Sequence, residues 1–156
     1  MTFMRPVDHR FPVIAHFGEL GEHYDYEADP MTGFWMPKTS KIGHHRGTDF
    51  ACPIGTPVRA IADGMVVKSR YDSDMDHSIG DGLHVIQVIM MPGYDAWWAK
   101  YSRLSRSHVA IGQRIKQGDV IGKTGESGYT TNPKLHVDLA NTNHQYHPIL
   151  WAETLE

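Results

Sequence analysis

Two short stretches of the sequence carry side chains that could bind a metal ion. His45 and Asp49 are four residues apart in GHHRGTDF, and His136 lies in KLHVDL near the C-terminal end. On a straight strand His45 and Asp49 would be about 13 Å apart, too far to share one ion, but Gly47 between them allows the chain to turn. Two imidazole nitrogens and one carboxylate oxygen would form a three-ligand zinc site with a fourth position open to water, as in catalytic zinc sites.

The same residues also have an interpretation without a metal, because a single histidine on a strand face is usually packed or hydrogen-bonded. Other local patterns are weaker. Asp72, Asp74 and Asp76 match the first, third and fifth positions of an EF-hand loop. However, His77 and Leu83 stand where that loop needs glycine and glutamate, which favours a solvated acidic loop. GDVIGKT has its glycines too close together for a phosphate-binding loop.

The elements that must position these side chains are expected to be short strands. Fifteen glycines and nine prolines interrupt the chain, and the runs between them are rich in branched and aromatic residues. This pattern is typical of an all-β antiparallel fold, and no window has the 3.6-residue apolar period of a helix. Asp63 and Gly64, between two such runs, predict a hairpin turn. We expect one domain over residues 1–156, with a core over 11–139 and a long surface loop over 18–43.

Composition and charge exclude some partners. The net charge of −3, without a basic stripe, gives no electrostatic basis for binding nucleic acid, and no apolar run approaches the ~18 residues of a membrane span. The single cysteine, Cys52, is expected to be a small buried residue. The first residues lack the apolar run of a signal peptide, so we expect a cytoplasmic protein or one associated with a phage virion or with lysis. Nothing in the sequence indicates an oligomeric state.

Most of the chain, from Phe11 to Leu139, resembles the M23 family of zinc metallopeptidases, the lysostaphin-type or LytM-like domains. HRGTD, which runs from His45 to Asp49, is similar to the family pattern H-x-G-x-D, and GTPVRAIADGMVV is similar to the hairpin that follows it. VAIGQRIKQGDVIGKTGESG resembles the glycine-punctuated turns of the family, and FPVIAHFG resembles its entry strand. The resemblance implies a barrel-sandwich-like, duplicated hybrid β-fold and hydrolysis of peptide bonds in bacterial peptidoglycan.

The resemblance assigns the zinc ligands to His45, Asp49 and His136. It also implies two histidines beside the zinc, one in Y-x-H-L-S and one in H-x-H, where this chain reads YSRLS and KLH, with Arg103 and Lys134 in their places. Arg103 cannot accept a proton, although it could hold a carbonyl oxygen or an oxyanion. Repulsion of about 2.5 kcal/mol from the zinc would favour loss of the Lys134 proton, but too weakly to make the neutral form common at pH 7. Lys134 would therefore stay mostly protonated and be a poor base.

Two functions from different classes fit these residues. In the first, the domain is a zinc-dependent endopeptidase for peptidoglycan peptides, weak or altered because Arg103 and Lys134 replace the histidines. Loss of general acid–base catalysis would lower its rate by ~100–10,000-fold. In the second, the domain is a catalytically degenerate zinc-binding module that binds the cell wall or a partner protein.

Other residues could complete such a site. Tyr24, Trp35 and Tyr129 could line a groove for an extended peptide. Of Trp97 and Trp98, at least one is expected in the core, because neighbours on a strand face opposite ways. Four further side chains could supply the missing base, although packing or solvent exposure is the more common role for each: His44, His84, His108 and Glu126.

Overall fold

The computed structural model of the chain describes residues 2–21, 26–28, 31, 35–37, 43–90, 93, 95–128, 132–143 and 146. Their regular structure is entirely β, as the sequence predicts, and the strand pairs are antiparallel. The strands are β1 (Val13–Ala15), β2 (Leu20–Gly21), β3 (Tyr26–Ala28), β4 (Trp35–Pro37), β5 (Gly43–His44), β6 (Thr48–Phe50), β7 (Pro57–Arg59), β8 (Gly64–Tyr71), β9 (Leu83–Met90), β10 (Ala96–Ser107), β11 (Arg114–Ile115), β12 (Val120–Thr124) and β13 (Leu135–Asn141). Over these residues the chain forms no helix that could span a membrane.

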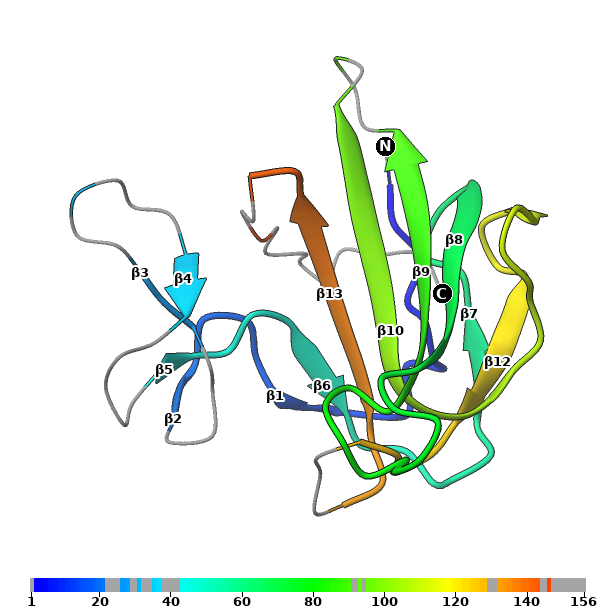
Figure 1. The fold of residues 1–156 in the computed structure, drawn as a ribbon, viewed down its shortest axis with the longest axis horizontal. Helices are drawn as coiled ribbons and strands as arrows, with labels where there is room; N and C mark the ends of the chain where they lie inside the picture. The colour runs from blue at the N-terminus through cyan, green and yellow to red at the C-terminus, as the bar shows by residue number, and fades with distance from the viewer. Residues whose placement is uncertain are drawn as a thin grey trace.

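The larger sheet is organised around its longest strand, β10. Within the described residues it has nine strands, with seven in the order β1-β6-β13-β10-β9-β8-β11, while β12 pairs with β10 and β7. Figure 1 shows the long strands β13, β10, β9 and β8 standing side by side. Because β10 pairs with β9, β13 and β12, it joins the strand that precedes it in the chain to two strands that follow it.

A second, smaller sheet lies to one side of the larger one (Figure 1). It contains β2, β5, β3 and β4 in that order. The sequence had suggested a long surface loop over residues 18–43. Three of these strands fall within that segment, so it contributes paired strands to the small sheet. Residues 45–47 join β5 to β6, which connects the small sheet to the large one between β1 and β13.

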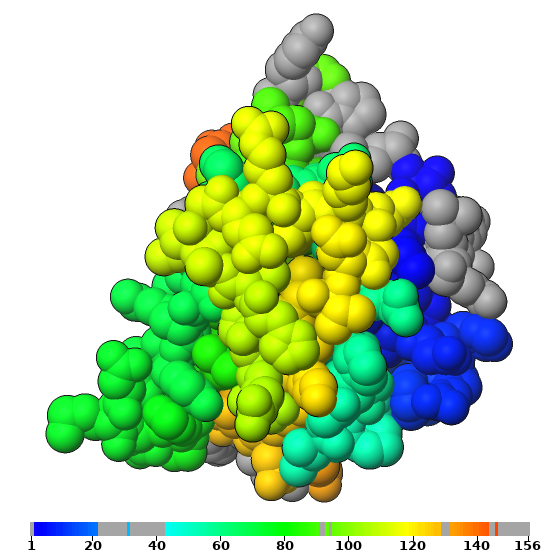
Figure 2. Space-filling model, turned by 90° about the vertical axis from the view of Figure 1, so that its right-hand side faces the viewer, coloured from blue at the N-terminus to red at the C-terminus, as the bar shows by residue number. Residues whose placement is uncertain are grey.

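The glycine-punctuated segment after β10 forms compact turns between very short strands, as predicted. β11 pairs with β8, and β12 pairs with β7 and β10. Figure 2 shows this segment, in yellow, across the middle of one face, with the segment around residues 70–80 in green at one side and the N-terminal segment in blue at the other. It therefore closes one side of the core.

The hairpin predicted at Asp63 and Gly64 is wrong. β7 and β8, on either side of these residues, do not pair with each other; β7 pairs with β12, and β8 pairs with β9 and β11. Asp63 instead accepts a hydrogen bond from the backbone N–H of Gln117, at 2.8 Å. Gly64 is needed because β9 approaches closely: a Cβ there would overlap the carbonyl oxygen of Val88.

The core is closed by alternating side chains of the long strands. Fully buried side chains include Val85 and Ile89 of β9 and Tyr101 of β10, and Trp97 packs against this cluster. Trp97 and Trp98 are both half-buried, so Trp97 packs against the core at its edge instead of lying within it, as had been predicted for one of the two tryptophans. Cys52 is buried, as expected, and burial raises the pKa of its thiol.

Tyr101 carries a polar group into this core and satisfies it there. Its hydroxyl accepts a hydrogen bond from the N–H of Ile61, at 2.9 Å, and donates to Oε1 of Gln87. The Gln87 amide in turn donates to the carbonyl oxygen of Ala62, at 3.0 Å. These bonds connect the segment between β7 and β8 to the central strands β9 and β10. The bonded groups have little access to water, so each needs its partner within the protein.

We expect Tyr101→Phe to lower the free energy of unfolding by about 1–3 kcal/mol, because the buried N–H of Ile61 and the oxygen of Gln87 lose their partner. Urea denaturation followed by tryptophan fluorescence would measure the change. Tyr71→Phe is the matched control, because none of the hydrogen bonds found among the described residues involves the Tyr71 hydroxyl. Equal effects of the two substitutions would contradict the assigned role of Tyr101.

Candidate metal centre

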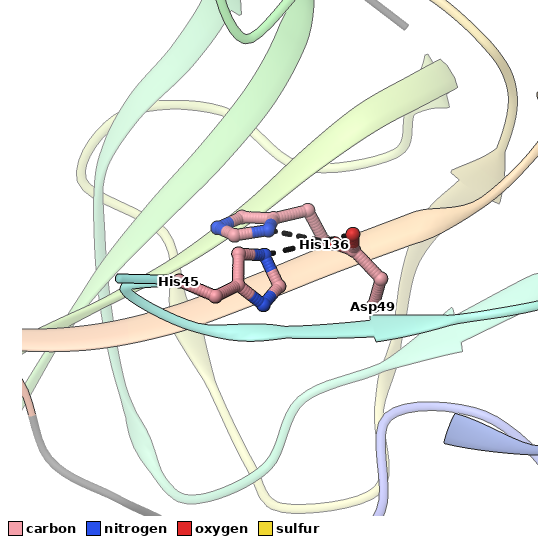
Figure 3. Close-up of side chains that lie close together, drawn as sticks. All are labelled: His45, Asp49 and His136. Carbon is pink, nitrogen blue, oxygen red and sulfur yellow. Dashed lines mark hydrogen bonds and ion pairs between the residues drawn. The ribbon is translucent and has the colours of Figure 1, made fainter. Parts of the chain in front are cut away.

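The predicted metal-binding side chains come together where β5, β6 and β13 meet. His45 follows β5, Asp49 lies in β6, and His136 lies in β13 directly opposite Asp49 in the strand register. Their ligand atoms all lie within 4.8 Å of one another, and all three residues are buried. Figure 3 shows the two imidazole rings and the carboxylate facing one another. No other group of three or more histidine, cysteine or acidic side chains in the described residues has such an arrangement.

Gly47 allows β6 to pack against β13. The chain bends at Gly47, as predicted from the spacing of His45 and Asp49. The absence of a side chain has a second reason, which the sequence did not reveal. A Cβ at this position would overlap the carbonyl oxygen of Val137 and lie 2.8 Å from Cβ of Asp138. Gly47 is therefore required by the close approach of two backbones.

Hydrogen bonds on the outer side of each imidazole leave an inner nitrogen directed at Asp49. Nδ1 of His45 lies 3.1 Å from the carbonyl oxygen of His16, which can only accept, so this nitrogen carries the proton. Nε2 of His45 then faces Oδ2 of Asp49 at 3.5 Å. On the other ring, Nε2 of His136 lies 3.0 Å from Oδ2 of Asp138 and Nδ1 lies 2.8 Å from Oδ1 of Asp49. Two ring nitrogens and a carboxylate are thus arranged to bind a divalent metal ion.

The charges of the site are strongly coupled in the metal-free protein. Burial alone would raise the pKa of Asp49, but its contacts with His136 and His45 outweigh burial and hold this pKa far below its usual range. Burial alone would lower the pKa of His136, but its bonds to Asp138 and Asp49 outweigh burial and raise it. The inner nitrogen of His136 therefore holds a proton more tightly than usual until a metal replaces that proton.

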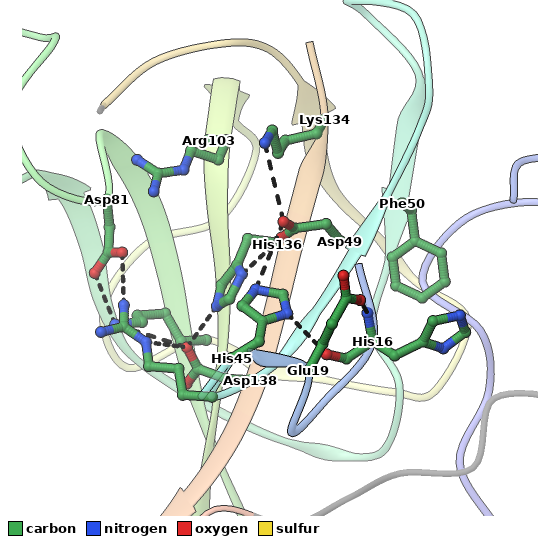
Figure 4. Close-up of polar contacts among 12 residues, drawn as sticks. His16, Glu19, His45, Asp49, Phe50, Asp81, Arg103, Lys134, His136 and Asp138 are labelled. Carbon is green, nitrogen blue, oxygen red and sulfur yellow. Dashed lines mark hydrogen bonds and ion pairs between the residues drawn. The ribbon is translucent and has the colours of Figure 1, made fainter. Parts of the chain in front are cut away.

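The structure places Lys134 at the metal centre, with its Nζ 3.9 Å from Oδ2 of Asp49. The Arg103 side chain is directed elsewhere: its Nη1 donates to the carbonyl oxygen of Gly80 and its backbone N–H donates to the carbonyl oxygen of Asp81, at 3.0 Å. Figure 4 shows Lys134 directed at Asp49 and Arg103 turned toward the segment that carries Asp81. Whether these two cations stand where the family has histidines is not tested by the structure and stays a prediction.

Arg103 has an unusual backbone conformation, with a φ of 71°. Most non-glycine residues avoid this left-handed region, whereas asparagine, aspartate and histidine occupy it more readily. The position lies at an irregularity in the pairing of β10 with β9, between Tyr101 and Leu104. The strand therefore bulges beside His136, whose register partner in β10 is Ser102.

The four candidates for a replacement base lie in different settings. Nδ1 of His84 is 2.9 Å from the carbonyl oxygen of Gly82, and burial lowers the pKa of this histidine. His108 and Glu126 are exposed, and His44 lies half-buried in β5. None of the contacts found for His84, His108 or Glu126 among the described residues joins them to the three metal-binding side chains.

The predicted groove aromatics remain predictions. Tyr24 and Tyr129 lie outside the described residues, and Trp35 lies in β4, where only the backbone is described.

The acidic loop of Asp72 and Asp76 uses its carboxylates locally: Oδ2 of Asp72 accepts from the N–H of Asp81 at 2.6 Å, and Oδ1 of Asp76 accepts from the N–H of Ser78 at 2.9 Å.

The sequence reasoning missed Asp138, whose carboxylate contacts the side chain of His136. Asp138 accepts the hydrogen bond of His136 and also contacts Nε of Arg46 at 3.2 Å and Nζ of Lys100 at 3.9 Å. A signal was present, because residues two apart on a strand share a face and Asp138 follows His136 by two. Its partners Arg46 and Lys100 come from distant parts of the chain, so the sequence could not indicate them.

Comparisons with known proteins agree with this geometry. Residues 43–148 match the family described as peptidase family M23. The peptidoglycan DD-endopeptidase ShyA of Vibrio cholerae is 31% identical over 147 residues, which cover 81% of this chain and 32% of ShyA. The chain spans a third or less of the length of the first curated relatives it matches.

Solved structures with the same fold include two that cover nearly all of the chain. The catalytic domain of the prophage-encoded M23 protein EnpA from Enterococcus faecalis, solved as a point mutant, superposes with a TM-score of 0.66 at 26% identity, covering 93% of each chain. A zinc-containing peptidase from Vibrio cholerae gives a TM-score of 0.68 at 26% identity, covering 94% of this chain and 39% of that one.

The pKa shifts predict how the stability of the metal-free protein depends on pH. Asp49 and Asp138 have lowered pKa values, to about 2 for Asp138, so their stabilisation is complete above the ordinary value of 3.8 and is lost in more acidic solution. His136 has a raised pKa, so its stabilisation is complete below 6.5 and is lost as pH rises through the raised value. We therefore expect greatest stability between these two ordinary values in chelator-treated protein.

Urea denaturation across this pH range would measure the effect. His136→Asn should remove the decline on the alkaline side, whereas His108→Asn, at an exposed histidine, should retain it. A stability that continues to rise from about pH 6 to about pH 9 in metal-free wild-type protein would contradict the expected contribution of His136.

Proposed function

Because this chain belongs to peptidase family M23, we propose that His45, Asp49 and His136 bind one zinc ion and that the domain acts on peptides of bacterial peptidoglycan. The observation that carries the proposal is the arrangement of the two imidazoles, each held on its outer side so that an inner nitrogen faces the same carboxylate. Such a set of nitrogen and oxygen donors suits zinc and leaves a coordination position open. The activity of ShyA, a peptidoglycan DD-endopeptidase, supports a peptidoglycan peptide as the ligand.

When bound, zinc supplies a Lewis acid and makes a coordinated water more acidic. The residues of this chain then determine how far hydrolysis proceeds. Lys134 beside Asp49 brings a positive charge that can hold a carbonyl oxygen, but neither it nor Arg103 readily accepts a proton at neutral pH. We expect slow turnover, because general acid–base catalysis is missing from both positions.

A second candidate function is a zinc-binding module without turnover that recognises the cell wall or a partner protein. The contacts of the two cations favour it. Lys134 pairs with Asp49. Arg103 donates a hydrogen bond to the carbonyl oxygen of Gly80, so its side chain lies against the loop before β9 rather than over the metal centre. Binding of a peptide would need only the surface and the metal, and no proton transfer.

Restoring histidines separates the two candidates. Arg103→His combined with Lys134→His should raise the rate of peptidoglycan hydrolysis by about 100-fold or more, because histidine can accept a proton at neutral pH. Histidine is also tolerated at the left-handed backbone of position 103. Release of soluble fragments from purified peptidoglycan, with zinc content measured on the same samples, would test this.

Two further variants control this experiment. His136→Ala should abolish zinc binding, and His108→Ala, at an exposed histidine far along the chain from the ligands, should change nothing. Slow wild-type turnover that is lost in His136→Ala supports the peptidase, whereas zinc binding with no turnover until both histidines are restored supports the binding module. A wild-type protein that takes up no zinc would overturn the proposal.

Lys134 should also weaken metal binding, because its ammonium group and the metal compete for Oδ2 of Asp49. After solvent screening, the repulsion between the ammonium group of Lys134 and the metal ion is worth about 1–2 kcal/mol. We therefore expect Lys134→Met to bind zinc about tenfold more tightly in a competition titration with a chromophoric chelator. Lys123→Met, at an exposed lysine of β12, is the control, and an unchanged or weaker affinity of the Lys134 variant would contradict this role.

A further inference from the structure

Four charged residues form a connected network on the outer side of His136. Oδ2 of Asp138 contacts Nε of Arg46 at 3.2 Å and Nζ of Lys100 at 3.9 Å. The same two cations also contact Asp81: Nη2 of Arg46 lies 2.8 Å from its Oδ1, and Nζ of Lys100 lies 2.7 Å from its Oδ2. Two carboxylates and two cations thus alternate, so the network is neutral without His136. Figure 4 labels the two carboxylates, Asp81 and Asp138.

The network is assembled from parts of the chain that are far apart in sequence. Arg46 lies between β5 and β6, Asp81 precedes β9, Lys100 lies in β10 and Asp138 lies in β13. Lys100 and Asp138 are register partners across β10 and β13. The side chain of Asp138 is only 4% exposed, and those of Arg46, Asp81 and Lys100 are 14–18% exposed. A buried carboxylate needs such partners to remain charged.

The direction of the hydrogen bonds gives this network a role at the metal centre. Oδ2 of Asp138 accepts from both Arg46 and Nε2 of His136, so it is held from one side and holds the imidazole on the other. With its proton on Nε2, His136 presents Nδ1 to Asp49 and to a metal beside it. Carboxylates that hold a ligand histidine in this way typically affect metal affinity by 10–100-fold.

We propose that Asp138, held in place by Arg46 and Lys100, is the positioning residue that makes His136 bind metal through Nδ1. The inference rests on the proposed zinc site and adds residues that are not themselves ligands. Asp81 completes it by fixing the two cations, and its backbone carbonyl accepts the N–H of Arg103 at 3.0 Å. The segment of Gly80 and Asp81, which accepts hydrogen bonds from Arg103, is therefore connected to the same charged network that orients His136.

Zinc affinity, measured by competition with a chelator, tests the first part. Asp138→Leu should bind zinc about 10–100-fold more weakly. Asp138→Asn should lose less, because its amide oxygen can still accept from both Nε2 of His136 and Arg46. Asp81→Asn should show a smaller loss, because it acts only through Arg46 and Lys100. Asp74→Asn, at an exposed acid of the neighbouring loop, should bind zinc like the wild type.

Nitrogen-15 NMR of the histidine rings tests the positioning itself in metal-free protein at alkaline pH. The proton on Nε2 of His136 should be visible and protected from solvent exchange in wild type and in Asp138→Asn, and lost in Asp138→Leu. A general loss of stability would not move this one signal. Should Asp138→Leu not fold, the affinities of Asp138→Asn and Asp81→Asn and the Nε2 signal of wild type decide.

The outcomes separate this inference from the proposed function. Equal zinc affinity and equal protection of the Nε2 proton in wild type and Asp138→Leu would overturn the positioning role while leaving the zinc site intact. A wild-type protein that binds no zinc would overturn the proposed function, and the Nε2 signal in metal-free protein would still decide whether Asp138 orients His136.

Discussion

The site depends on one pairing, that of β6 with β13. These strands place Asp49 opposite His136, although the two residues are 87 positions apart in the chain. A shift of this register by one residue would turn every side chain of β13 to the opposite face and separate the metal-binding atoms. The missing side chain of Gly47 permits the close approach, since a Cβ there would overlap the backbone of Val137. Packing and chemistry therefore impose the same requirement at this position.

The three candidate metal-binding residues and the fold class could be predicted from the sequence because their signals are local. HRGTD and KLH are short, and the glycine-rich punctuation of the chain indicates short strands wherever they pair. The pairing of the strands is not local, which is why the prediction of a hairpin at Asp63 and Gly64 was wrong. Gly64 reads as a turn residue from its neighbours, but it is required by the approach of β9. Likewise, nothing near Asp138 indicates Lys100 or Arg46 as its partners.

Burial makes the polar groups of the site depend on one another. Asp49 and Asp138 are both buried carboxylates, and His136 lies between them, 2.8 Å from one and 3.0 Å from the other. Without a metal, a proton shared within this group compensates part of the negative charge, which explains the raised pKa of His136. A metal ion would take over that compensation on the side of Asp49. The side of Asp138 would remain served by Arg46 and Lys100, so the two carboxylates have separate partners in the loaded site.

This separation bears on what a substitution of Lys134 or Arg103 can change. The ligand geometry is fixed from behind, by the carbonyl oxygen of His16 for one imidazole and by Asp138 for the other. Lys134 and Arg103 approach from segments outside this framework: Lys134 lies just before β13, and Arg103 lies on the bulged part of β10. A substitution at Lys134 alters the charge beside Asp49, and neither Lys134 nor Arg103 makes the hydrogen bonds that orient the imidazoles. The groups that orient the two imidazoles are thus distinct from Lys134 and Arg103, and a chain of this fold can keep the geometry of the candidate metal site whatever stands at those two positions.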